Sequence, residues 1–175
     1  ERAPDEEVPL TSFGAASFVP GGRGLLLMTS LFEDTYGLGY LALDEPQTVA
    51  RVEVRGVVHE GRGEMELLKH LRANRYAVQY NIDGCTWLYE GRFDADALEM
   101  RLDKVICGQA PLADGVMDSF NYDEASNRFV LSYSTATSPT QLYTVAGADR
   151  GDVARHTNER VLGLSADLLA PGVRH

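Results

Sequence analysis

Cysteine is scarce in this sequence, where Cys85 and Cys107 are the only two thiols in 175 residues. Two cysteines do not make the disulfide framework that holds small secreted domains together. We therefore expect both thiols to be free, in a reducing compartment such as the cytoplasm.

Long apolar runs are missing as well. The longest, such as LLLM at residues 25–28, are far too short to cross a bilayer. The first ten residues, ERAPDEEVPL, lack the basic and then apolar pattern of a signal peptide, and they lack an initiator methionine. We expect a chain that has no membrane partner and that is processed or excised from a longer one.

Positive charge is in short supply. Lysine and arginine together number 16 against 26 aspartates and glutamates, which gives a net charge of −10. Because no basic cluster offsets this negative charge locally, the protein would repel a nucleic-acid duplex or an anionic membrane. We therefore do not expect a nucleic-acid partner. The hydrophobic fraction of 44% is ordinary for a globular domain.

The sequence does contain an internal repeat. Three apolar runs have the composition of strands: LLLMTS (25–30), YAVQYN (76–81) and FVLSYS (129–134). They begin 76 − 25 = 51 and 129 − 76 = 53 residues apart. Each has one strand-like run in front of it and two behind, separated by Gly, Asn, Asp and Pro. Each repeat therefore predicts four antiparallel strands.

The segment MELLKHLRA at residues 65–73 also fits a helical turn, because of the spacing of its leucines. Its place in the repeat matches the first strand of the other units. We predict a strand there.

The predicted fold class is all-β, a partial β-propeller of about three four-stranded antiparallel blades. The blades span roughly residues 14–57, 64–108 and 115–160, within a single propeller region covering 1–175, and a tail follows at 161–175. Closed propellers have about 4 to 8 blades, so three do not complete a ring. The open ends of such an array predict self-association or a covering by further sequence.

The stretch NIDGCTWLYEGRFD (81–94) gathers the single tryptophan, one cysteine and an Asp-Gly pair. Asp-Gly is a strong hairpin signal because the turn needs positive φ angles, and we expect a few further polar residues to extend the turn. Alternation then places Trp87 and Tyr89 on one face of the next strand and Leu88 on the other. We interpret the stretch as a structural hairpin.

Cys85 is not assigned as a nucleophile. A reactive thiol needs a neighbouring base or cation to lower its pKa. The four histidines, His59, His70, His156 and His175, are scattered along the chain and none is near Cys85 in sequence.

Metal and nucleotide motifs are incomplete. HEGRGE (59–64) lacks the second histidine of a zinc-protease helix, and Asp94 and Asp96 lack the glycine and closing glutamate of an EF-hand loop. We expect both to be solvated loops. GLGYLA (37–42) is expected to be a strand rather than a dinucleotide loop, and GGRG (21–24) a hairpin turn.

The nearest approach to a serine-hydrolase elbow is GLSAD (163–167), where aspartate stands in place of the second glycine of G-x-S-x-G. The sequence therefore predicts no catalytic triad, and no catalytic, cofactor-binding or metal-binding residue is assigned.

Two stretches carry a resemblance to a known family. Residues 81–94 resemble the N-x-D-G-x-x-x-L-Y hairpin in propeller blades of the prolyl oligopeptidase family of serine peptidases, and residues 117–145 resemble a late blade of the same domains. The late-blade pattern is matched at Phe120, Arg128, Phe129, Ser132, Ser134, Pro139, Leu142 and Tyr143. The tail from residue 155 looks like the run-out toward a hydrolase domain.

This resemblance implies a non-catalytic role. In that family an α/β-hydrolase domain carries the catalytic residues, while the propeller caps the active site and selects short or flexible peptides. The chain is then expected to gate peptide substrates for a hydrolase domain of its parent chain, and to be inactive alone. The alternative is a stand-alone, TolB-like propeller module for protein–protein interaction. A third possibility is an independent, closed all-β domain.

Overall fold

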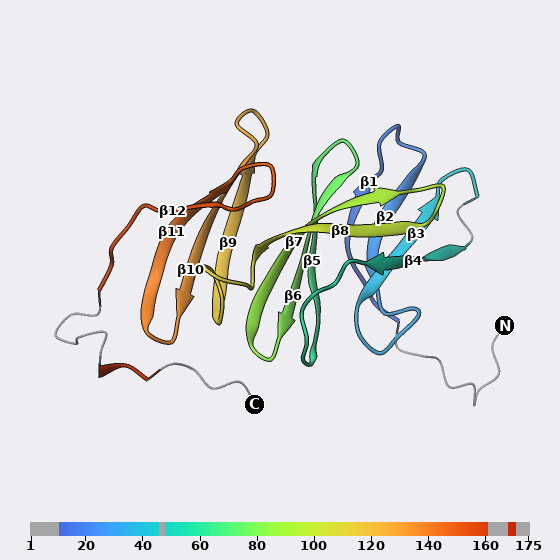
Figure 1. Ribbon diagram of the computed structural model, residues 1–175. Helices are drawn as coiled ribbons and strands as arrows, with labels where there is room; N and C mark the ends of the chain where they lie inside the picture. Colours follow the sequence, from blue (N-terminus) through green and yellow to red (C-terminus); the bar gives the residue numbers. More distant parts are fainter. Residues whose placement is uncertain (1–10, 46–47, 161–167, 171–175) are drawn as a thin grey trace.

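The computed structural model describes residues 11–45, 48–160 and 168–170, and strands dominate it (Figure 1). The described residues contain twelve strands and no α-helix. None of these residues belongs to a helix long and apolar enough to cross a bilayer. The prediction of an all-β chain is confirmed. Most of the predicted tail, 161–175, lies outside the described residues.

The first four strands form an antiparallel meander, called here the first meander. Its strands are β1 (Phe13–Phe18), β2 (Gly24–Thr29), β3 (Gly37–Ala42) and β4 (Val49–Arg55), each paired with the one before it. The predicted GGRG turn joins β1 to β2, and its first two glycines have φ angles of 85° and 67°. The predicted strand GLGYLA is β3.

The second meander is formed by longer strands. These are β5 (Gly63–Arg72), β6 (Arg75–Ile82), β7 (Cys85–Asp94) and β8 (Glu99–Cys107), again paired antiparallel in sequence order. The strand predicted for MELLKHLRA is confirmed as most of β5. Bulges in its pairing with β6 explain why its leucines depart from strict alternation.

The third meander repeats the same arrangement. It consists of β9 (Gly115–Asp123), β10 (Arg128–Thr135), β11 (Ser138–Ala146) and β12 (Asp152–Arg155). Its strands form a separate four-stranded antiparallel sheet in the order β12-β11-β10-β9.

The first two meanders share one sheet. Their last strands, β4 and β8, pair in parallel around Val54 and Met100, which gives the order β1-β2-β3-β4-β8-β7-β6-β5. Because β1 also contacts β5, the eight strands curve back on themselves like an incomplete barrel. This differs from the separate four-stranded blades expected from the sequence. The sequence pattern of consecutive hairpins does not predict that β4 and β8, which are far apart in the chain, pair with each other.

The second meander lies between the other two, as Figure 1 shows. One apolar cluster joins its inner side chains to the first meander and includes Leu26 and Tyr89, which are 0% and 1% exposed. A second cluster joins its opposite face to the third meander and includes Leu88 and Phe129, both 0% exposed. Both faces of the middle strands are therefore removed from water.

The Asp-Gly hairpin forms as the sequence indicates, with one difference. Asp83 and Gly84 have φ angles of 49° and 79°, and Ile82 pairs directly with Cys85 across the turn. The loop is therefore the two-residue type that positive φ at both central positions permits. The expectation that further polar residues extend the turn is wrong, because β7 begins at Cys85, directly after Gly84.

Candidate functional site

The cysteines occupy different environments. Cys107 is buried at the end of β8 and Cys85 is half-buried at the start of β7; both are free thiols. Burial raises the pKa of the Cys107 thiol to about 12, so it stays protonated near neutral pH. A protonated, buried thiol is a poor nucleophile. Cys107 therefore acts as a small apolar side chain of the second cluster.

His59 is not the solvated loop residue that the sequence suggested. Its ring centroid lies 4.7 Å from that of Tyr80 and 5.7 Å from those of Trp87 and Tyr89. The Tyr89 hydroxyl is 2.8 Å from its Nδ1 and accepts a hydrogen bond of 3.1 Å from its backbone N–H. The connection between β4 and β5 is thus anchored on the aromatic face of β6 and β7.

Burial sets the protonation of this aromatic group. Desolvation lowers the pKa of His59 and raises that of Tyr80 to about 12. Desolvation also raises the pKa of Tyr89. This effect outweighs the hydrogen bonds from the backbone N–H groups of Val58 and His59, which lower the pKa. The indole Nε1 of Trp87 is buried and has no hydrogen-bond partner among the described residues. All four rings are neutral at pH 7, so they supply packing and hydrogen bonds rather than charge.

The predicted alternation of β7 is confirmed by this cluster. Trp87 and Tyr89 face the first meander and Leu88 faces the third. What sequence reasoning missed was the partner, because His59 approaches from a connection about 30 residues away in the chain. The sequence signal for an aromatic cluster was that aromatic residues stand at alternate positions of one hairpin.

The incomplete metal motifs have structural roles. Asp94 accepts hydrogen bonds from the backbone N–H groups of Asp96 and Ala97, at 3.0 and 3.1 Å, and so closes the turn between β7 and β8. Glu60 and Glu64 are exposed. Within the part of the chain that the structure describes, no three His, Cys, Asp or Glu side chains are grouped so that they could hold a metal ion. The GLSAD segment, 163–167, lies outside that part.

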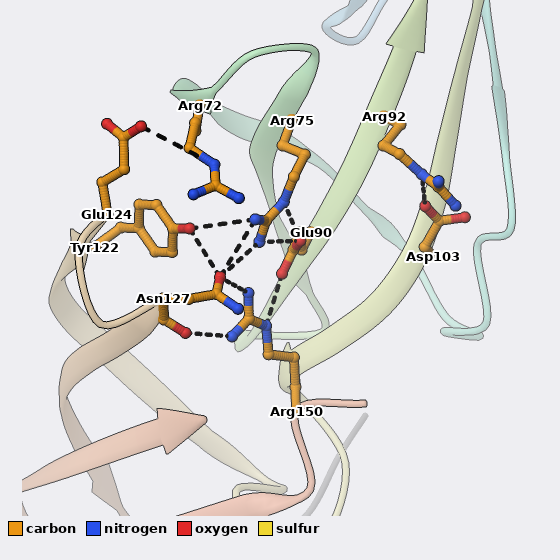
Figure 2. A network of polar contacts seen from close by, with 9 residues as sticks. All are labelled: Arg72, Arg75, Glu90, Arg92, Asp103, Tyr122, Glu124, Asn127 and Arg150. Carbon is orange, nitrogen blue, oxygen red and sulfur yellow. Dashed lines mark hydrogen bonds and ion pairs between the residues drawn. The ribbon is translucent and has the colours of Figure 1, made fainter. Parts of the chain in front are cut away.

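A buried ion network joins the second and third meanders (Figure 2). Glu90, on β7, is only 4% exposed and binds two arginines. Arg75 Nε donates to its Oε1 at 2.5 Å, and Arg150 Nε donates to its Oε2 at 2.7 Å. Arg150 itself is 3% exposed and lies in the turn between β11 and β12.

The network is completed from the turn between β9 and β10. Arg150 Nη1 donates to the backbone oxygen of Asn127 at 2.7 Å, and its Nη2 donates to Asn127 Oδ1 at 2.9 Å. The Tyr122 hydroxyl donates to the same Oδ1 at 2.8 Å. Asn127 and Arg150 both have positive φ, 54° and 65°. Arg150 thus binds the carboxylate of Glu90 directly, while Asn127, in the other turn, binds the two arginines that hold this carboxylate.

This arrangement holds sheets together rather than performing chemistry. Both Glu90 oxygens are paired, and the guanidinium of Arg150 lies 5.0 Å from the centre of the Phe129 ring, within the second apolar cluster. Breaking such a pair leaves an uncompensated buried charge, which is strongly destabilising. The outer pair of Arg92 and Asp103 is more exposed and contributes less. The sequence signal for this buried network was Glu90, a charged residue inside the largely apolar run WLYEGRF.

A groove opens at one end of the first two meanders. It has a volume of about 730 Å³ and lies between the turn after β3 and the turn after β7, with Tyr40, Asp44, Glu45, Asp96 and Leu98 among its lining residues. Three carboxylates beside apolar and aromatic surface favour a cationic or amine-bearing ligand over an anionic one.

Neither the protein-family models nor the curated proteins give a relative from which function can be transferred. No family model matches the sequence, and no curated protein matches it significantly.

Proposed function

We propose that the three meanders are consecutive blades of a β-propeller and that the chain is the non-catalytic, substrate-selecting part of a prolyl-oligopeptidase-like serine peptidase. The hydrolase domain that would cut the peptide is not among the residues of this chain. The role proposed here is to admit peptides of suitable size and charge to that domain.

The observation that carries this proposal is the burial of both faces of the second meander. Leu88 and Tyr89 are neighbours in β7, yet they belong to different apolar clusters shared with different meanders. Propeller blades are four-stranded antiparallel sheets stacked face to face. The third meander is a sheet of this kind, and the first two, although joined through β4 and β8, each keep the four-stranded antiparallel order. The hairpin of residues 81–94, which carries the family resemblance, lies in the second meander.

The acidic groove supports the choice of peptides as the selected molecules. Asp44, Glu45 and Asp96 line it together with Tyr40 and Leu98. A peptide presents a positively charged amino terminus and apolar side chains, which match such a surface. The net charge of −10 would also raise the rate at which cationic peptides arrive.

Peptide binding to the intact chain tests the proposal. Fluorescence anisotropy of a labelled peptide with a free amino terminus should show saturable binding, and the acetylated form of the same peptide should bind more weakly. Asp44→Asn combined with Asp96→Asn should weaken binding, whereas Glu60→Gln, an exposed carboxylate outside the groove, should leave it unchanged. Equal binding of both peptides to all three proteins would contradict the proposed selection.

The peptidase link has a separate test. The chain alone should not hydrolyse peptide p-nitroanilides or acyl-amino-acid esters, and the genomic reading frame should continue beyond His175 into a G-x-S-x-G elbow. Turnover by the chain itself that a serine-directed phosphonate blocks would contradict the assignment, and so would a stop codon directly after His175.

A second candidate function is a stand-alone propeller module that binds a protein partner. The observation that favours it is exposed apolar surface: Phe13 and Phe18 of β1 are 60% and 65% exposed. Large exposed aromatic side chains are typical of interaction surfaces. The stop codon that would contradict the peptidase link would support this module.

A further inference from the structure

His59 is the only residue of the connection between β4 and β5, residues 56–62, that is not exposed. Its neighbours Val57 and Val58 are apolar, yet they are 41% and 58% exposed. The connection therefore reaches the aromatic face of the second meander through one side chain, the imidazole that lies against the Trp87 ring.

The two ends of this connection are fixed through the backbone. Asp83 N–H donates a hydrogen bond of 2.8 Å to the Arg62 carbonyl, and Arg62 N–H donates one of 3.2 Å to Asp83 Oδ1. At the other end, Gly56 packs closely against the carbonyl group of Leu102. Between these fixed ends, His59 is the side chain that holds the connection in place.

The hydrogen bonds of the Tyr89 hydroxyl determine which nitrogen of His59 carries the proton. This oxygen accepts from the backbone N–H groups of His59 and Val58, at 3.1 and 3.4 Å. Its own proton then goes to His59 Nδ1, which is 2.8 Å away and is its remaining partner among the described residues. The ring is therefore the neutral tautomer with its proton on Nε2.

Protonation is incompatible with this arrangement. An imidazolium carries a proton on both nitrogens, so His59 Nδ1 would no longer accept a hydrogen bond from Tyr89. It would instead direct a third N–H group at an oxygen that already accepts two. The hydroxyl proton would lose its acceptor.

No counter-charge compensates a proton on His59. The groups that face it from β6 and β7 are Tyr80 and Tyr89, and both are neutral phenols with a raised pKa. Burial is the influence that moves the pKa of His59, and it lowers it. Glu60 and Arg62, on the same connection, are exposed. The charged side chains of the neighbouring strands have other partners: Arg55 binds Glu53 and Glu99, Glu66 binds Gln79 and Asn81, and Glu90 binds Arg75 and Arg150.

We propose that His59 is a proton-sensitive latch, whose neutral ring holds residues 57–60 on the aromatic face of β6 and β7 and whose protonation in weak acid releases them. The inference goes beyond the proposed function and does not depend on it.

Release opens the connection while the strands stay paired. β6 and β7 are joined from Arg75 and Arg92 at one end to Ile82 and Cys85 at the other, through backbone groups that do not titrate. The exposed residues beside His59 hold no buried contact that would resist the movement. In weak acid the chain therefore presents aromatic surface around Trp87 that His59 covers at neutral pH.

The single tryptophan of the chain reports on the latch, because Trp87 is one of the rings that His59 covers. Acrylamide quenching of its fluorescence in the whole chain should increase about twofold or more between about pH 7.5 and about pH 5. Far-UV circular dichroism should stay constant over this range, because the strands remain paired. An NMR titration should find the Nε2–H tautomer of His59 at the upper pH and the same midpoint as the quenching.

Two variants at the latch and one outside it complete the test. His59→Asn keeps an acceptor oxygen in the place of Nδ1 and takes up no proton, so it should lose the pH response. Tyr89→Phe lacks the hydroxyl and should be quenched at neutral pH as strongly as the wild type in acid. His156→Asn changes an exposed histidine that follows β12, and this matched control should respond as the wild type does.

Four results would overturn the latch. Unchanged quenching while His59 takes up its proton would mean that the aromatic faces retain the imidazolium as a cation. A His59 ring that stays neutral down to about pH 5 would show that the device does not operate in weak acid. A pH response that persists in His59→Asn would assign it to another group. A loss of circular dichroism in step with the quenching would show that unfolding, not release of the connection, exposes Trp87.

Discussion

Arg150 Nε lies 2.7 Å from Glu90 Oε2, although 60 residues separate the two in the chain. The contact ties the turn between β11 and β12 to the middle of β7, and Arg75 occupies the other oxygen of the same carboxylate. The third meander forms a sheet of its own, so its position depends on this network and on the apolar cluster around Leu88 and Phe129.

Glu90→Ala should lower the free energy of unfolding by about 3–5 kcal/mol, because it leaves two buried guanidinium groups without their counter-charge. Asp103→Ala, which removes the partner of the 60%-exposed Arg92, should cost at most about 1 kcal/mol. Urea titrations followed by circular dichroism give both values. Equal losses in the two variants would show that the buried network does not hold the third meander in place.

Gly108→Ala should also destabilise the protein. Gly108 has a φ of 122°, and an added Cβ would collide with the Trp87 ring. Overpacking of this kind costs about 1–3 kcal/mol, and the backbone strain adds to it. Gly37→Ala is the control, since nothing lies within 4 Å of its Cβ position and its φ is not positive. Equal shifts of the thermal unfolding midpoint in Gly108→Ala and Gly37→Ala would contradict this prediction.

The aromatic cluster predicts a stability that falls in weak acid. Burial holds the pKa of His59 below its ordinary value of 6.5 in the folded chain, so the unfolded chain takes up the proton first. The contribution of the neutral ring is complete above pH 6.5 and is lost as the pH falls from there through the lowered folded pKa. His59→Gln should therefore have a flatter stability profile than the wild type.

This pH dependence is measured as the difference in urea midpoint between wild type and His59→Gln, from about pH 7.5 to about pH 5.5. The comparison removes the effect of carboxylates that titrate in both proteins. Parallel profiles would mean that His59 is as well solvated in the folded chain as in the unfolded one.

The two thiols should react at different rates. Cys85 is half-buried and should be alkylated by iodoacetamide in the native protein, whereas Cys107 is buried and its pKa is raised to about 12. Mass spectrometry should find one label per native chain and two after unfolding in urea. Rapid double labelling of the native chain would contradict the burial of Cys107.

Local structure was largely predictable from the sequence. The Asp83–Gly84 pair needs positive φ and fixes a hairpin, and alternation along β7 then assigns Trp87 and Leu88 to opposite faces. The repeat period identified β5 as a strand where leucine spacing alone was ambiguous. In each case the controlling interaction lies within one hairpin or one repeat.

Contacts between distant segments were not predictable in the same way. The parallel pairing of β4 with β8 depends on how two meanders curve toward each other, and no local pattern encodes it. The placement of His59 against Tyr89, and of Arg150 against Glu90, likewise depends on tertiary packing. The sequence around a polar residue in a strand does not show which residue of a distant loop or turn it will bind.

The second meander is packed between the first and the third. The most direct measurement is a set of nuclear Overhauser effects from two adjacent residues of β7, with methyl and ring protons resolved by selective labelling. Leu88 should show effects to Phe129 and Leu131 of the third meander, and Tyr89 should show effects only to its own cluster, which includes residues of the first. Effects from both residues to the same neighbouring meander, or from Leu88 to neither, would contradict the stacked arrangement and the propeller function proposed from it.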